Sequence, residues 1–148
     1  MGADPGDRFD LQRFVEAQTG VHEQVCAELR AGKKRSHWMW FVFPQIRGLG
    51  SSEMAVKYGI SGQEEARAYL DHPILGPRLL ECARIVVGLE GKTVGEIFGY
   101  PDDLKFHSSM TLFHEVDGPA ERVFHQVLKK YFGGKTDQAT LERLASTR

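Results

Sequence analysis

The sequence is poor in the features that define secreted, membrane-spanning and nucleic-acid-coating proteins. It contains only two cysteines, Cys26 and Cys82, which lie far apart, so no disulfide framework is indicated and a reducing compartment suits the chain. Its 19 basic and 20 acidic residues leave a formal net charge of −1, which does not indicate a nucleic-acid partner, although a local basic patch keeps that class open. No apolar run approaches the roughly 20 residues of a membrane span, and residues 1–10 lack the apolar stretch of a secretory signal. We therefore expect a cytoplasmic protein with no membrane association.

Local motifs for metal or nucleophilic chemistry are also missing. None of the six histidines forms an H-x-x-x-H pair and there is no C-x-x-C, so we expect no metal ion, and no motif indicates a cofactor. The sequence has no G-x-S-x-G, and neither cysteine stands beside a cation or a base in the sequence. Gly48-Leu49-Gly50 is a G-x-G without the third glycine of a dinucleotide fingerprint. Any activity must therefore come from residues that the fold brings together.

Helical periodicity accounts for most of the chain. Apolar residues recur at spacings of three, four and seven from Leu11 to Leu29, with Thr19–Gly20 as a break, and the stripe from Leu75 to Val86 is the clearest of all. Asp10, Ser61 and Thr93 are predicted N-caps, the last two in S/T-x-x-E capping boxes. The prediction is an all-α, compact orthogonal helical domain over residues 10–148, with about seven to nine helices, preceded by a flexible tail over residues 1–9.

The segment Lys33–Gly50, KKRSHWMWFVFPQIRGLG, combines aromatic surface with cations and amides. Because periodicity cannot separate helix from strand in so short an apolar run, residues 37–43 are assigned to a short helix only because both neighbouring segments are helical. Aromatic planes stack on flat ligands, and cations hold anions. We therefore expect a ligand site here, formed by Lys34, Arg35, His37, Trp38, Trp40, Gln45 and Arg47. A buried core is the alternative for the apolar residues, and it stays open.

A second polar cluster lies between Pro101 and His114. If this segment is helical, Asp103 and His107 are four residues apart and meet on its surface, so Asp103 could orient the imidazole for general acid–base catalysis. Lys105, Ser108 and Ser109 add hydrogen-bond donors for a ligand. The alternative is that an aspartate only caps the helix and His107 has a structural partner. Since sites collect groups from separated segments, we expect this segment to lie beside the Trp segment.

Several phrases of the sequence resemble a bacterial family, the domain-of-unknown-function 1810 family, some of whose members carry the label calpastatin. They include ELRAGKKRSHWMWFVFPQIRGLG, EARAYLDHPILGPRLLECA and IFGYPDDLKFHSSMTLF, and the similarity extends from about Asp10 to Leu144. The resemblance implies a single helical domain and no particular activity. A more distant similarity is to the NADAR superfamily, small helical proteins linked to NAD and ADP-ribose chemistry.

Three functional hypotheses follow from these observations. The first is a hydrolase or N-glycosidase acting on a nucleotide-like or ADP-ribose-like ligand, with Asp103 and His107 transferring protons. The second is a non-catalytic nucleotide-binding, anion-binding or regulatory module that uses the same groups. The third is a structural or dimerising protein without a small-molecule site. The expected partner is a phosphate-bearing small molecule, and the sequence leaves the oligomeric state open.

Overall fold

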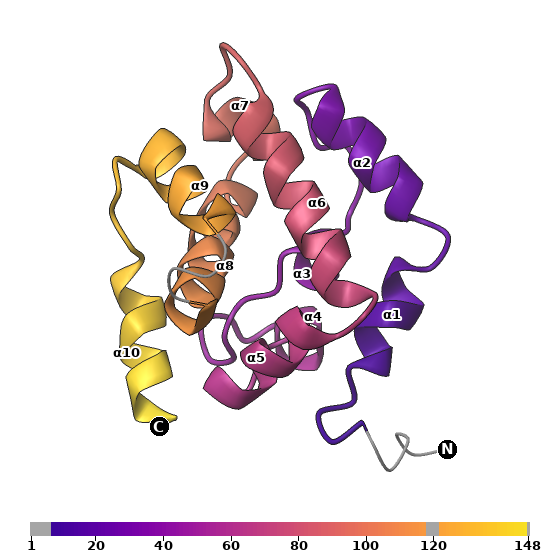
Figure 1. Ribbon diagram of the computed structural model, residues 1–148, viewed down its shortest axis with the longest axis vertical. Coiled ribbons are helices and arrows are strands. Elements are labelled where there is room, and N and C mark those ends of the chain that lie inside the picture. The colour runs from indigo at the N-terminus through magenta and orange to yellow at the C-terminus, as the bar shows by residue number, and fades with distance from the viewer. Residues whose placement is uncertain (1–6, 118–121, 148) are drawn as a thin grey trace.

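The computed structural model describes residues 7–117 and 122–147. Within these residues the chain forms ten helices and no β-strand (Figure 1). The all-α prediction is therefore confirmed, but the described helices outnumber the seven to nine expected. The helices are α1 Gln12–Gln18, α2 His22–Arg30, α3 Met39–Val42, α4 Glu53–Lys57, α5 Gln63–Asp71, α6 Leu75–Gly88, α7 Val94–Phe98, α8 Asp102–Asp117, α9 Val123–Phe132 and α10 Gln138–Ser146.

Helix α6 is central to the fold. It contacts α2, α5 and α9, and in Figure 1 it crosses the front of the molecule between α2 and α9. Its apolar stripe is buried, with Leu79 only 1% exposed. The stripe that was clearest in the sequence thus faces the core, because an amphipathic helix gains most from burying that face.

Helix α8 is the second buried helix. It packs against α5, α7, α9 and α10, and every residue from Ser108 to Phe113 is buried, including the polar Ser109 and Thr111. A helix that is covered on several sides loses the clean division into polar and apolar faces. The sequence of α8 accordingly shows little separation between a polar and an apolar face.

The ambiguous Trp segment is helical over Met39–Val42, as predicted. Its neighbour Phe43 is fully buried, and its ring lies 4.9 Å from the ring centroid of Phe106 on α8 and 6.0 Å from that of Phe98. The predicted contact between the Trp segment and residues 102–111 is therefore confirmed. These aromatic contacts fix α3 against α8.

Two of the predicted helix caps are wrong. Asp10 has a φ of 53° and does not cap α1; the carboxylate of Asp7 accepts the N–H groups of Leu11 and Gln12 instead. Residues 1–6 of the predicted tail lie outside the described residues. At α5 the Ser61 hydroxyl makes no cap, because Gly62 is the N-cap residue and Glu65 reaches back to accept the Ser61 N–H at 2.8 Å. The capping box at Thr93 and Glu96 is confirmed.

An isolated parallel bridge between Ile46 and Ile60 closes the segment that contains α4. Arg47 N donates to Ile60 O at 2.7 Å, and Ile60 N donates to Gln45 O at 2.8 Å. None of the five residues of α4 is buried, so α4 lies on the surface between two chain ends that are held together. In the described part of the chain, no helix combines the length and the apolar character needed to span a membrane.

Candidate functional site

A surface groove of about 450 Å³ lies where the Trp segment, α4, α8 and the start of α10 meet. Trp40 and Gln45 contribute from the Trp segment, and Lys105 and Ser108 from α8. The rest of the wall is formed mainly by small or apolar residues and loop hydroxyls, namely Leu49, Gly50, Ser51, Ser52, Ala55, Pro101, Leu104, Asp137 and Ala139. A concave, largely apolar surface with a few polar groups is the usual form of a small-molecule site.

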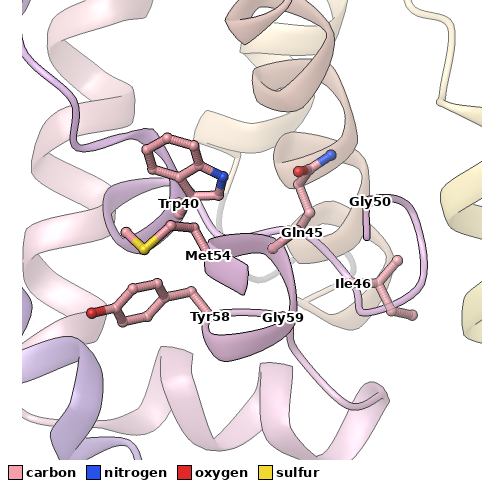
Figure 2. Close-up of a pocket in the computed structure, with 8 residues that line it drawn as sticks. Trp40, Gln45, Ile46, Gly50, Met54, Tyr58 and Gly59 are labelled. Carbon is pink, nitrogen blue, oxygen red and sulfur yellow. The ribbon is translucent and has the colours of Figure 1, made fainter. Parts of the chain in front are cut away.

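A narrow pit continues the groove beneath Trp40 (Figure 2). Figure 2 shows the Trp40 indole above Met54 and Tyr58, with the Gln45 amide opposite the indole nitrogen. Among the described residues, neither the Trp40 N–H nor the Gln45 side chain makes a hydrogen bond. These two groups therefore offer donors and an acceptor at one edge of the groove.

Glu28 explains why the first half of the Trp segment does not face this groove. Its carboxylate is buried and accepts hydrogen bonds from five donors, which are Arg35 N, Ser36 N, Ser36 Oγ, Gln24 Nε2 and Trp38 Nε1. Burial alone would raise the pKa of Glu28, but these hydrogen bonds to the charged form outweigh it and lower the pKa to about 2. Trp38 is only 2% exposed, so the structure places it in the core and not on a ligand.

Of the two predicted ligand-binding lysines near Asp102, Lys34 has a structural role and Lys105 lines the groove. Lys34 is held by an ion pair of 2.8 Å with Asp102, and its side chain is 8% exposed. Lys105 lies 3.5 Å from the same carboxylate and 4.5 Å from the ring centroid of Trp40. Because Asp102 is already paired closely with Lys34, Lys105 is the more weakly held of the two cations and the one that faces the groove.

The Asp103–His107 pair does not form in the structure. Asp103 Oδ1 accepts the N–H of its neighbour Leu104 at 2.9 Å. The His107 Nε2 atom lies 2.8 Å from the carbonyl oxygen of Lys135, and its ring stacks on Phe132 at 4.0 Å. Neither residue lines the groove. Their role in proton transfer remains a prediction, but the contact on which that role depended is absent.

The other predicted ligand residues also lie away from the groove lining. Arg47 is exposed, and its guanidinium donates to Gly59 O at 3.3 Å. Arg35 and His37 are exposed on the turn before α3, whereas Ser109 is fully buried and its hydroxyl has no hydrogen-bond partner. A role in ligand binding remains a prediction for Arg35, His37 and Arg47, and burial removes Ser109 from the accessible surface.

Asp137 is the groove residue that the sequence did not mark as functional. One carboxylate oxygen, Oδ2, accepts the hydroxyls of Ser108 at 2.9 Å and Thr140 at 2.6 Å, and also caps α10. In the described part of the chain, the other oxygen, Oδ1, accepts no hydrogen bond. In the sequence, Asp137 followed three residues later by Thr140 appears only as an ordinary helix start, and its position beside α8 depends on the tertiary fold.

The described residues thus form an all-helical fold with an open groove on its surface. The family model described as "Protein of unknown function (DUF1810)" matches residues 8–144, so the chain belongs to this family. The chain is similar to the conserved hypothetical protein Rv1873 from Mycobacterium tuberculosis, whose crystal structure was determined at 1.38 Å. The two are 58% identical, with a TM-score of 0.92, over 94% of this chain and 99% of the other. No curated protein matches the chain significantly.

Proposed function

We propose that this protein binds a small molecule with a flat, hydrogen-bonding ring and an anionic group, the class that includes nucleotides and ADP-ribose-like compounds. The supporting observation is the convergence of the Trp40 N–H, the Gln45 amide and the Lys105 ammonium on one groove. The ring edge would hydrogen-bond to Trp40 and Gln45, and the anion would pair with Lys105. Apolar residues such as Leu49 and Leu104 would cover the rest of the ligand.

Hydrolysis of the same ligand, or cleavage of its N-glycosidic bond, is the second candidate function. Asp137 supports it, because this carboxylate lines the groove with one oxygen held by Ser108 and Thr140, while the other accepts no hydrogen bond from the described residues. A carboxylate that is held in place can act as a general acid or base. Asp103 and His107 would then be dispensable for the reaction.

Thermal unfolding in the presence of nucleotides, NAD and ADP-ribose tests the binding proposal. A ligand at about 100 times its Kd stabilises the native state by roughly 2.7 kcal/mol, which raises Tm by roughly 5–10 °C in a domain of this size. We expect this shift to be lost in Gln45→Leu and strongly reduced in Lys105→Gln. Lys129→Gln, which removes an exposed cation on α9, serves as the control and should respond like the wild type. An equal shift in Lys105→Gln, or no shift with any compound, contradicts the proposal.

Product analysis distinguishes binding from catalysis. The protein is incubated with each compound that raises Tm, and the released base or phosphate is separated by chromatography. Asp137→Asn retains a good N-cap residue for α10 but removes the charged carboxylate. Turnover in the wild type that disappears in Asp137→Asn supports the catalytic candidate, whereas an intact ligand supports binding alone.

A further inference from the structure

Three metal-ligating side chains meet where α2 packs against α6, away from the groove. His22 and Cys26 lie one helical turn apart on α2, and Cys82 faces them from α6. One ring nitrogen of His22 and the two Sγ atoms all lie within 4.8 Å of one another. Both thiols are buried, with Cys26 4% and Cys82 1% exposed.

We propose that His22, Cys26 and Cys82 bind one Zn²⁺ ion. With Zn–S near 2.3 Å and Zn–N near 2.0–2.1 Å, tetrahedral geometry sets the N···S separation at roughly 3.6 Å and the S···S separation at roughly 3.8 Å. The His22 Nε2 atom lies 3.6 Å from Cys26 Sγ, so this pair already has the required spacing. Binding requires only that Cys82 Sγ occupy the third corner, and the limit of 4.8 Å keeps that movement small.

Glu81 lies beside these three ligands but outside the cluster that they form, so the fourth position is left to solvent. The Glu81 Oε1 atom lies 2.9 Å from His22 Nε2, and Glu81 precedes Cys82 on the same helix. The Glu81 side chain is half exposed and that of His22 is partly exposed, so the ion would enter from the surface while the thiolates close the site from the core. Ion binding transfers the two thiol protons to solvent, and the two thiolates and the His22 imidazole, released from Glu81, then coordinate the cation.

The donor set determines the class of ion. Two thiolates and an imidazole suit Zn²⁺ and other borderline or soft ions, and they do not suit Mg²⁺ or Ca²⁺, which prefer oxygen ligands. The sequence could not indicate this site, because H-x-x-x-C is half of a ligand set and Cys82 follows more than fifty residues later. The ion would join the N-terminal part of the chain to the central helix, which is the position of a structural site.

Titration of the full chain with Zn²⁺ alone, in buffer containing a phosphine reductant, tests the proposal. We expect one tightly bound ion per chain by native mass spectrometry and calorimetry. Replacement of Zn²⁺ by Co²⁺ should give the intense visible absorption of tetrahedral cobalt and the near-ultraviolet band of thiolate-to-cobalt charge transfer. His22→Ala alters a partly exposed residue, and it should weaken binding at least about tenfold, since even changes to outer-sphere partners cost 10–100-fold.

Cys82→Ser should abolish the charge-transfer band, and circular dichroism checks that this variant is folded. His125→Ala is the matched control, because His125 is exposed on α9 with its ring 5.7 Å from that of His114, where adventitious binding would occur. Binding that is lost in His125→Ala and retained in His22→Ala overturns the proposal. It is also overturned if the reduced protein binds no Zn²⁺ and mild oxidation simply links Cys26 to Cys82.

Discussion

Glu28 shows how one buried carboxylate can set the conformation of a whole segment. Its side chain accepts the hydrogen bonds of the turn at Arg35 and Ser36 and of the Trp38 indole. The direction of α3, and with it the position of Trp40 in the groove, follows from these bonds. In the sequence Glu28 is one of many glutamates on a helix, and only its partners distinguish it.

Replacing Glu28 with Gln should lower stability in a pH-dependent way. Because the folded-state pKa of about 2 lies below the unfolded value, the ionised carboxylate stabilises the fold above about pH 5, and this contribution is lost as pH falls towards 2. The full shift corresponds to roughly 3 kcal/mol, an upper limit that solvent screening reduces. Urea unfolding at several pH values should show a difference between wild type and Glu28→Gln that narrows on acidification. Glu23→Gln, exposed on the same helix, should change stability by less than about 0.5 kcal/mol.

At the scale of the element, α6 depends on a close approach at its first turn. A Cβ atom added to Gly76 would lie 2.1 Å from the carbonyl oxygen of Leu70, at the end of α5. Nothing lies within 4 Å of a Cβ atom added to Gly88, at the other end of the same helix. The close contact between α5 and α6 therefore requires a glycine at position 76, whereas position 88 has room for a side chain.

Gly76→Ala should destabilise the protein by about 1–3 kcal/mol, because the new methyl group forces α5 and α6 apart. Gly88→Ala should be neutral or stabilising by up to about 1 kcal/mol, since alanine favours the helix and meets no neighbour. Both values can be measured by urea unfolding. Equal effects of the two substitutions would contradict the close α5–α6 contact.

The helices with a strong apolar periodicity were predictable from the sequence, whereas the candidate site was predictable only in part. The stripe of α6 and the capping box at Thr93 depend on nearby residues, so the sequence reveals both. The cap at Asp7 and the reach of Glu65 to Ser61 depend on loop geometry that propensities do not determine. Four of the predicted ligand residues do line one groove, namely Trp40, Gln45, Lys105 and Ser108. Trp38 instead donates a hydrogen bond to Glu28, and Lys34 forms an ion pair with Asp102. The sequence did not indicate these partners, because only the tertiary fold brings them together.

At the scale of the whole molecule, one apolar core joins residues from Leu11 to Leu144. Trp38 lies inside this core, and α6 and α8 contribute many of its other members. Such a core has no internal boundary along which part of the chain could separate. The single domain expected over residues 10–148 remains a prediction.

The chain should therefore unfold in one cooperative step. Near-ultraviolet circular dichroism, which reports on the packing of Trp38, should follow the same urea transition as far-ultraviolet circular dichroism, which reports on the helices. Coincident midpoints and slopes are expected for the two signals. An earlier loss of the tryptophan signal would show that the packing around Trp38 loosens before the helices unfold.

The bridge between Ile46 and Ile60 has a further consequence for how the groove can change. The bridge holds together the two ends of the segment between Ile46 and Ile60, and this segment contains α4, which has no buried residue. The entropy of closing such a segment rises only slowly with its length, by roughly 0.6 kcal/mol for each doubling. Residues 48–57 can therefore be lengthened or replaced at a small entropic cost while the core residues on either side stay in place.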